Sequence, residues 1–505
     1  MSKTIVDLLQ RGDEKTAAIA ASSRDPLTYS ALRIHVAETV STLNQLGIGR
    51  NDPVAIVLPN GPEMATAFVS VAAAATTAPL NPGYKTEEFE FYLADLDAKL
   101  LIVESGSDTP AREAAEKLGI AVAELEPTCG SAGLFRLHGD TAAGPPRNEP
   151  VVSNDIALVL HTSGTTSRPK IVPLTHGNIC ATADHIRETL ALAPADCCLN
   201  IMPLFHIHGL IGAVLSSLAA GASIFCTPGF NALKFFAWMR EAKPSWYTAV
   251  PTMHQTILGR ASGNCETIES GRLRFIRSSS ASLPPQIMHQ LEETFHAPVI
   301  ESYGMTEAAH QMSSNPLPPR ERKAGTVGVA AGPEVAIMNE EDELLSAGST
   351  GEIVIRGPNV TPGYQNNPEA NATAFTNGWF RTGDQGVLDP NGYLTITGRL
   401  KEIINRGGEK ISPREIDEVL LDHPAVIQAV TFAVPHEKLG EAVAAALVLD
   451  ESSAVTERDI RDFARNRLAD FKVPRHVVFL KEIPKGPTGK LQRIGLADKL
   501  GLTQV

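Results

Sequence analysis

The chain has 505 residues, which is too long for one compact core and predicts two or more domains. Hydrophobic residues make up 43% of it and charged residues 20%, which is the composition of an ordinary globular protein. The formal net charge of −13 argues against a nucleic-acid-binding protein, which would normally present a basic face.

Cysteine usage and the terminal segments favour a cytoplasmic protein. The six cysteines show neither a CxxC pair nor metal-finger spacing, and even the adjacent Cys197 and Cys198 are expected to be buried, reduced thiols. The first residues, MSKTIVDLLQRGDE, lack the apolar core of a signal peptide, and the last residues, GLTQV, are not a peroxisomal signal. No apolar run reaches about 18 residues, so we expect no membrane span.

The first half of the chain alternates between strand-like and helix-like segments. Apolar runs at residues 53–58, 99–105 and 156–160 predict strands, and a segment of helical composition follows the first of them. Apolar residues recur at helical spacing over residues 175–191, with Thr175 as the expected N-cap. This alternation predicts an α/β fold in which mainly parallel sheets are covered by helices.

From about residue 350 the pattern changes. The short runs GEIVIRG, GWFRTGD and GYLTITGR are separated by Gly and Asn, which predicts a small antiparallel, barrel-like unit. The chain then becomes α+β, with helices at 413–422 and near 456–468. We expect residues 1–398 to form the large domain, 399–401 a hinge, and 402–505 a small mobile C-terminal lid.

The segment LHTSGTTSRPK, residues 160–170, has the properties of a phosphate-binding loop. It is not a Walker P-loop, because Lys170 is followed by Ile171 and not by Ser or Thr. Gly164 permits unusual backbone angles, small residues let a polyphosphate approach the backbone amides, and Lys170 supplies positive charge. Hydroxyl groups come from Thr162, Ser163, Thr165, Thr166 and Ser167. Taken alone, a polar surface loop without function remains an alternative.

Distant segments add the other groups that a nucleotide needs. ESYGMTEAAH places Glu307 after a turn of small residues, where its carboxylate can hold Mg²⁺ on phosphate oxygens. GWFRTGD ends in Asp384, an acceptor suited to two ribose hydroxyls, and the C-terminal motifs supply Arg399 and Lys490. Together these segments predict a nucleotide site, which removes the surface-loop alternative.

The ordered motifs TSGTTSRPK, YGMTE, GWFRTGD, GRLKEIINRGGEKISP and PKGPTGK resemble the adenylate-forming superfamily. Its members are acyl-CoA synthetases, beetle luciferases and peptide-adenylation domains, and the resemblance covers about residues 25–495. It implies that a carboxylate attacks the α-phosphate of ATP, giving an acyl-adenylate and pyrophosphate. The lid then rotates, and the thiol of coenzyme A displaces AMP. ATP, Mg²⁺ and coenzyme A are therefore the implied cofactors.

The resemblance also implies roles for single residues. Lys490 matches the lysine that bridges the substrate carboxylate and the α-phosphate, and Thr306 matches the residue whose hydroxyl touches that phosphate. Glu307 matches the Mg²⁺ ligand, with Thr165 beside it, and Tyr303 is expected to stack on adenine. The implied ATP and AMP contacts are Thr162, Ser163, Gly164, Thr165, Thr166, Lys170, Ser280, Ala281, Ser282, Glu301, Ser302, Tyr303, Gly304, Thr306, Asp384, Arg399 and Lys490.

Three residues of the lid match family positions that serve its motion and the thiol substrate. Lys401 falls at the family's hinge, and Gly407 and Gly408 match the segment that lines the pantetheine tunnel, where side-chain bulk is not needed. Acetylation of Lys490 by a protein acetyltransferase would remove its charge, which makes such an enzyme a possible partner.

The acid-binding pocket is expected to be polar. His206, His208, Ser280 and His310 would line it, together with Ser282, while the direction of Arg277 stays open. A buried methylene is worth about 0.8 kcal/mol, whereas a charge pair at ~4 Å is worth about 4 kcal/mol at intermediate dielectric. The pocket therefore favours a short acid with a second carboxylate. That carboxylate would in turn favour the charged form of a nearby histidine. HTSGTTSRPK and INRGGEKISP also resemble the oxalyl-CoA synthetases of plants and fungi, which implies oxalate.

Several alternatives stay open at this point. A medium-chain or aryl acyl-CoA synthetase is the main one, and the polar lining of the pocket argues against it. A peptide-adenylation domain would need an acidic group for an amino substituent and a carrier domain after it, and neither is evident. A luciferase-like oxygenase needs a different pocket, and a catalytically silent nucleotide-binding module would lack Lys490.

Overall fold

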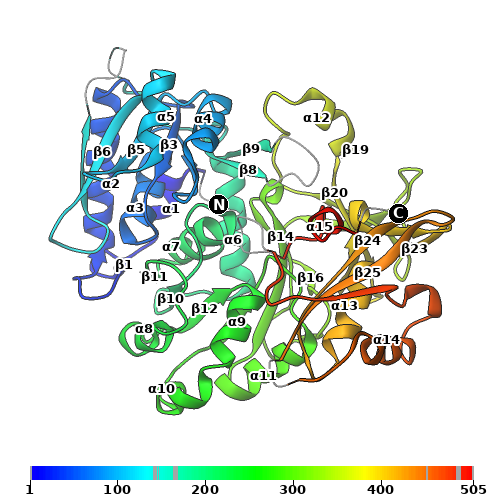
Figure 1. Ribbon diagram of the computed structural model, residues 1–505. Helices are drawn as coiled ribbons and strands as arrows, with labels where there is room; N and C mark the ends of the chain where they lie inside the picture. The colour runs from blue at the N-terminus through cyan, green and yellow to red at the C-terminus, as the bar shows by residue number, and fades with distance from the viewer. Residues whose placement is uncertain are drawn as a thin grey trace. The chain divides into compact units, whose positions relative to one another are not determined.

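The computed structural model describes residues 3–139, 145, 147–162, 169–450, 453–484 and 491–502 (Figure 1). The chain divides into two compact units. The first, the large unit, comprises residues 1–335 and 355–380, and the second, the lid unit, comprises 336–354 and 381–505. The hinge predicted at residues 399–401 concerns a motion, and it stays a prediction.

The large unit contains two sheets. The seven-stranded sheet has the order β7-β6-β5-β3-β4-β8-β9, parallel at its centre with β7 and β9 antiparallel at its edges. Its central strands are buried along their length, which is why they read as continuous apolar runs. The strands are β3 (Pro53–Val57), β4 (Thr76–Pro79), β5 (Leu100–Glu104), β6 (Ala121–Pro127), β7 (Phe135–Gly139), β8 (Ile156–Thr162) and β9 (Lys170–Thr175).

The nine-stranded sheet has the order β16-β15-β14-β13-β12-β10-β11-β1-β2 and carries Thr248 on β12 and His310 on β15. Its strands from β11 to β14 are parallel, so their carboxyl ends meet at one edge. The strands are β1 (Ala17–Ala20), β2 (Leu27–Thr28), β10 (Cys197–Asn200), β11 (Ser223–Cys226), β12 (Trp246–Ala249), β13 (Phe275–Ser278), β14 (Val299–Met305), β15 (His310–Ser314) and β16 (Val329–Ala330).

Helices cover both sheets, as the alternating pattern predicts. Helix α6 (His176–Thr189) confirms the predicted helix, and Thr175 caps it by accepting from the backbone of Asn178. The other helical segments of the large unit are α1 (Ile5–Leu9), α2 (Tyr29–Gln45), α3 (Pro62–Ala72), α4 (Thr86–Asp95), α5 (Pro110–Leu118), η1 (His208–Leu215), α7 (Ser216–Ala219), α8 (Phe235–Ala242), α9 (Pro251–Leu258), η2 (Ala261–Asn264), α10 (Cys265–Glu269), α11 (Pro285–Phe295), η3 (Thr306–Ala308) and α12 (Pro368–Ala374).

The predicted small β unit is a five-stranded sheet with the path β17-β18-β20-β19, and β21 pairs with β20. The antiparallel pairing of β20 with β21 places Asp384 opposite Arg399. The strands are β17 (Glu334–Met338), β18 (Thr350–Arg356), β19 (Phe375–Thr376), β20 (Trp379–Leu388) and β21 (Leu394–Arg399).

The C-terminal part of the lid unit is α+β, as predicted. Strands β24 and β25 form a long antiparallel pair with an apolar cluster on each face. Its elements are η4 (Leu400–Glu402), β22 (Ile404–Arg406), β23 (Glu409–Ile411), α13 (Pro413–Leu421), β24 (Val426–His436), β25 (Gly440–Leu449), α14 (Glu457–Arg465), η5 (Asp470–Lys472), β26 (His476–Phe479) and α15 (Leu496–Lys499).

Two further expectations can be compared with the described residues. None of their helices combines the length and apolar character that crossing a membrane requires. All six cysteines are free thiols, and Cys180, Cys198 and Cys226 are buried as expected. Cys197, which was also expected to be buried, is half-buried, and Cys129 and Cys265 are exposed.

Candidate active site

The phosphate loop connects two paired strands of the large unit. Strands β8 and β9 are antiparallel, and Thr162 and Lys170 are opposite each other where the pairing ends. Residues 163–168 between them lie outside the described residues, and so do the predictions for Ser163, Gly164, Thr165 and Thr166. Lys490 also lies outside the described residues.

Lys170 and Glu307 are connected through a tyrosine that the sequence analysis did not identify. The Lys170 Nζ lies 4.3 Å from the centre of the Tyr364 ring, within range of a cation–π interaction. The Tyr364 hydroxyl donates to Glu307 Oε1 over 2.9 Å. Burial and the nearby Glu307 carboxylate raise the pKa of Tyr364, so that the phenol keeps the proton it donates. The sequence analysis missed Tyr364 because its segment PGYQ, residues 362–365, has no feature that distinguishes it from other loops.

Glu307 is held in a fixed position beside β14. It lies in η3 and is buried, and its backbone carbonyl accepts from the backbone of Thr361 over 2.7 Å. A buried carboxylate with one oxygen oriented by a phenol offers the hard oxygen that Mg²⁺ prefers. Glu307 therefore fits the predicted Mg²⁺ ligand, while Thr165 cannot be assessed with it.

A turn of serines follows β13. Ser280 has a φ of +73°, in the left-handed region where a glycine is normally favoured. Its neighbour Ser279 is anchored, because its hydroxyl donates to the backbone carbonyl of Ser302 over 3.0 Å. A strained residue of this kind is often found at a ligand site, since the surrounding structure must enforce it.

The other predicted nucleotide residues of this region lie on β14 or in the turn. Glu301 is buried and accepts from the backbone of Leu283 over 2.9 Å, so it also holds the serine turn in place. Tyr303 is nearly buried, and Gly304 follows it in β14. Ala281 is exposed and Ser282 is half-buried. Their contacts with adenine stay predictions.

His208, Ser280 and His310, three of the residues expected to line the acid-binding pocket, lie close together in the large unit. The His208 Nδ1 lies 3.0 Å from Ser280 Oγ, and its Nε2 lies 2.6 Å from Thr248 Oγ1. The rings of His208 and His310 are 5.0 Å apart, edge to face. These residues form the acid wall, a name kept below for His208, Thr248, Ser280 and His310. His206 is half-buried against Phe205, with ring centres 4.5 Å apart.

Two local features of the acid wall were not foreseen. His208 opens a π-helix, His208–Leu215, a rare conformation that is often found at functional sites. Thr248 belongs to the wall because its hydroxyl contacts His208. It lies there because it is the register partner of Arg277 in the neighbouring strand. Knowledge of the strand pairing would have revealed Thr248, and single-sequence patterns do not provide it.

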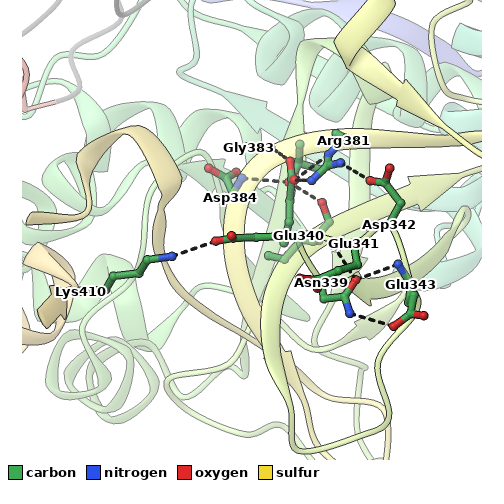
Figure 2. Close-up of polar contacts among 12 residues, drawn as sticks. Asn339, Glu340, Glu341, Asp342, Glu343, Arg381, Gly383, Asp384 and Lys410 are labelled. Carbon is green, nitrogen blue, oxygen red and sulfur yellow. Dashed lines mark hydrogen bonds and ion pairs between the residues drawn. The ribbon is translucent and has the colours of Figure 1, made fainter. Parts of the chain in front are cut away.

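Asp384 and Arg399, the predicted ribose-binding pair, are neighbours in the lid unit. The Arg399 Nε donates to Asp384 Oδ1 over 2.9 Å. Figure 2 shows Asp384 beside a network in which Arg381 pairs with Asp342 and the backbone of Gly383 donates to a carboxylate. That carboxylate belongs to Glu352, 2.8 Å from the Gly383 nitrogen. The part of β20 that carries Asp384 is thus held by Arg399 on the neighbouring strand and by the Glu352 carboxylate at Gly383.

The lid residues assigned to the hinge and the thiol tunnel lie on exposed turns. Lys401 is in the short helix η4, and Gly407 and Gly408 connect β22 to β23. Both glycines have left-handed φ angles, +62° and +97°, which explains their residue type locally. Lys410, two residues beyond, pairs with Glu340 over 2.8 Å (Figure 2).

Arg493 anchors the C-terminal segment that follows Lys490, and it was missed by the sequence analysis. Its guanidinium pairs with Glu402 over 2.6 Å and with Asp417, and its Nε donates to the carbonyl of Thr431 over 2.6 Å. The three residues form the lid clamp, defined as Arg493, Glu402 and Asp417. The clamp connects the segment next to the predicted hinge with the segment that bears Lys490.

The mixed α/β fold matches that of solved adenylate-forming enzymes. The family model "AMP-binding enzyme" matches residues 8–365, and the model "AMP-binding enzyme C-terminal domain" matches residues 415–490. The chain therefore belongs to the AMP-binding enzyme family.

Similar proteins cover nearly the whole chain. An oxalate–CoA ligase of Arabidopsis thaliana is 46% identical over 97% of this chain and 98% of its own length. An oxalate–CoA ligase of Saccharomyces cerevisiae is 42% identical, covering 89% and 87% of the two chains. Among solved structures, ATP-bound MatB from Rhodopseudomonas palustris matches with a TM-score of 0.89 and 28% identity over 99% of both chains.

Proposed function

We propose that this protein is an ATP-dependent acid–thiol ligase that joins a small dicarboxylic acid, oxalate in preference to others, to coenzyme A. The acid wall carries the proposal, because it is built from buried polar groups where a fatty acid would need apolar surface. The two relatives named oxalate–CoA ligases support the same substrate.

The size of the substrate follows from the energetics of the acid wall. An acid of two carbons offers almost no apolar area, so its recognition depends on hydrogen bonds and charge. His208, Ser280 and Thr248 form one hydrogen-bonded chain, with distances of 3.0 and 2.6 Å, whose donors can turn toward an oxygen-rich ligand. A long aliphatic chain would place apolar surface against these polar groups and would gain no hydrogen bond from them.

The reaction takes place in two balanced steps. A carboxylate oxygen attacks the α-phosphorus of ATP, the bond to pyrophosphate breaks, and an acyl-adenylate forms. The thiol of coenzyme A then attacks the acyl carbon, loses its proton to solvent, and displaces AMP. Lys490 and Thr306 stabilise the charge on the α-phosphate in the first step. Mg²⁺, which Glu307 would hold with Thr165, supplies positive charge for the phosphate oxygens.

The experiment that tests this function is pyrophosphate release with ATP, Mg²⁺ and a panel of acids, with and without coenzyme A. We expect oxalate to give the highest kcat/KM, malonate a lower value, and octanoate and coumarate values near background. Turnover with octanoate or coumarate alone would show that the protein is a medium-chain or aryl acyl-CoA synthetase. ATP consumption that ignores the acid would contradict ligase activity altogether.

The hinge and the tunnel form the second part of the proposal. Residues 399–401 permit the lid, residues 402–505, to rotate between the two steps, and Gly407 and Gly408 then line the path of pantetheine. Lys401→Pro fixes the backbone of η4 and should stop thioester formation while adenylate formation survives. Lys401→Ala is the control, because it removes the side chain without fixing the backbone, and it should retain both steps.

Acetylation of Lys490 would switch the enzyme off at the first step. The modification removes the charge that the α-phosphate needs, and Lys490→Gln imitates it. Treatment of the purified enzyme with an acetyl donor and a protein acetyltransferase should lower adenylate formation and leave the reaction of preformed oxalyl-adenylate with coenzyme A intact. Equal loss of both steps would contradict this role.

A further inference from the structure

Arg277 is a buried cation beside the acid wall that the proposed mechanism does not use. Its side chain is fully buried on β13. Its hydrogen-bond partners are His310 Nε2, 3.4 Å from one terminal nitrogen, and Gln311 Oε1, 3.0 Å from the other. Among the residues that the structure describes, no carboxylate pairs with it, and its Nε has no hydrogen-bond partner.

Gln311 fixes the direction of this guanidinium. The Gln311 amide nitrogen donates to Thr189 Oγ1 over 3.1 Å and to the carbonyl of Ala331 over 3.0 Å. Both of these partners accept from a nitrogen, so the amide oxygen must face Arg277. The other terminal nitrogen of Arg277 is then directed at His310 and has little freedom to turn away.

The guanidinium determines which nitrogen of His310 carries the proton. Arginine has only donor groups, so the His310 Nε2 beside it must be an acceptor and the imidazole proton must be on Nδ1. Protonating Nε2 as well would place a second positive charge 3.4 Å from the first. Burial lowers the pKa of Arg277 to about 10, which still leaves it charged at neutral pH. The positive charge of the pair therefore stays on Arg277.

The imidazole of His310 is packed between two glycines. A Cβ added to Gly212 would lie 2.5 Å from the ring atoms Cδ2 and Nε2, and one added to Gly304 would lie 2.6 Å from Nδ1. His310 itself has a φ of +110°, a backbone conformation that is costly for a residue other than glycine. Packing and backbone thus hold this ring in one place, at the expense of local strain.

We propose that Arg277 is a positioning residue of the acid wall: it fixes His310 as the Nδ1–H tautomer and supplies an uncompensated positive charge, so that the wall prefers an acid with a second carboxylate. This rests on the proposed function. A buried charge without a protein counter-ion is unfavourable, and an anionic ligand is the partner that would relieve it. The second carboxylate of a dicarboxylate has the required charge, while a neutral hydroxyl of the same size does not.

The test compares oxalate with glycolate, an acid of similar size in which a hydroxymethyl group replaces one carboxylate. In Arg277→Met the ratio of kcat/KM for oxalate to that for glycolate should fall about 10- to 100-fold, mainly through KM for oxalate. Arg277→Lys keeps the charge and should retain most of the ratio. Arg272→Met, an exposed arginine before the same strand, should leave it unchanged. Equal loss for both acids in Arg277→Met would overturn the proposal.

The tautomer of His310 gives a readout that does not depend on the substrate. ¹⁵N spectra of histidine-labelled protein, assigned with His310→Gln, should show the proton on Nδ1 in the unsubstituted protein and a mixture of tautomers in Arg277→Met. A proton on Nε2 in the unsubstituted protein would overturn the proposal. If Arg277→Met fails to fold, Gly212→Ala displaces the ring with the charge retained and should also lower the ratio. Failure of all dicarboxylates with the unsubstituted enzyme would contradict the proposed function, while the ¹⁵N result would still decide this tautomer.

Discussion

Two arginines, one in each unit, have opposite surroundings. Arg493 in the lid clamp pairs with Asp417 and Glu402, and its pKa is raised mainly by those carboxylates against burial. Arg277 in the large unit has a histidine and an amide as partners, and burial lowers its pKa. A charge that serves the fold is neutralised within the chain. A charge that serves a ligand is left for the ligand to neutralise.

The largest expected effect comes from breaking the lid clamp. Arg493→Met leaves Asp417 and Glu402 without their cation and should destabilise the lid unit by about 3 kcal/mol. This free-energy change is at the lower end of the range for breaking a buried ion pair, because 21% of the Arg493 side chain is exposed. Hydrogen exchange of lid peptides measures it. Arg465→Met, which removes an exposed pair with Asp462, should change stability by less than about 1 kcal/mol.

Acidification should act on the two units with opposite signs. Burial lowers the pKa of His176 to about 4, so the unfolded large unit binds more protons and stability falls as pH drops from 6.5 toward 4. Desolvation raises the pKa of Asp417 to about 6 despite Arg493, so its contribution is present near pH 4 and is lost as pH rises to 6. Each group contributes roughly 3 kcal/mol.

Intrinsic fluorescence can separate these two pH effects. Trp238, Trp246 and Trp379 are the three tryptophans of the chain, and all belong to the large unit. Urea titrations followed by tryptophan emission report on that unit, and hydrogen exchange of lid peptides reports on the other. Loss of lid stability between pH 6 and 4, parallel to that of the large unit, would contradict the opposite signs.

Lys490→Ala should separate chemistry from structure in the segment that Arg493 anchors. We expect adenylate formation to fall by about 10² or more, because a charge on the α-phosphate is no longer compensated. Reaction of preformed oxalyl-adenylate with coenzyme A should be nearly unchanged, and so should lid stability. Lys481→Ala, nine residues earlier, is the matched control. A drop in lid stability would show that Lys490 is part of the clamp.

Tyr364→Phe tests the phenol that orients Glu307. The substitution removes one hydrogen bond to a carboxylate, 2.9 Å long. We expect the Mg²⁺ concentration needed for half-maximal rate to rise by about 3- to 10-fold. The measurement is the Mg²⁺ concentration at half-maximal pyrophosphate release. Tyr393→Phe, in the residue just before β21 of the lid unit, is the control, and an equal shift there would mean that the effect is not local.

The smallest expected effect is on the stability of Arg277→Met without substrate. Replacing a buried charge that lacks a counter-ion by an apolar side chain is often neutral or slightly stabilising, so we expect a change within about 1 kcal/mol. Urea titration by tryptophan emission measures it. A loss like that in Arg493→Met would mean that the two arginines serve the same purpose, and the contrast between them would disappear.

Patterns local in sequence predicted most of the fold. The buried runs at β3, β5 and β8 and the capped helix α6 depend on nearest neighbours along the chain, and the structure confirms them. The meeting of His208, Ser280 and His310 also followed from motif positions. What was missed depends on contacts between distant segments, such as the pairing of Thr248 with Arg277 and of Arg493 with Glu402.

The charge expected for histidine in the acid pocket shows a limit of a different kind. A nearby carboxylate alone would favour a charged imidazole, which was the expectation. The structure instead places the permanent cation of Arg277 beside Nε2, and that arrangement assigns the positive charge to Arg277 and a fixed tautomer to His310. Which of two titratable neighbours carries the charge depends on the distance between them and on their burial. Neither quantity can be obtained from the sequence alone.

The lid clamp has a kinetic consequence. Arg493, three residues after Lys490, is tied to Glu402 at the start of the lid, so we expect the proposed rotation about residues 399–401 to carry this C-terminal segment with it. If Lys490 and the Gly407–Gly408 turn have the roles proposed above, the lysine is withdrawn from the α-phosphate whenever the turn approaches the thioester-forming position. Pyrophosphate should therefore leave before the thiol reacts, and double-reciprocal plots of initial rate at varied ATP and coenzyme A should give parallel lines.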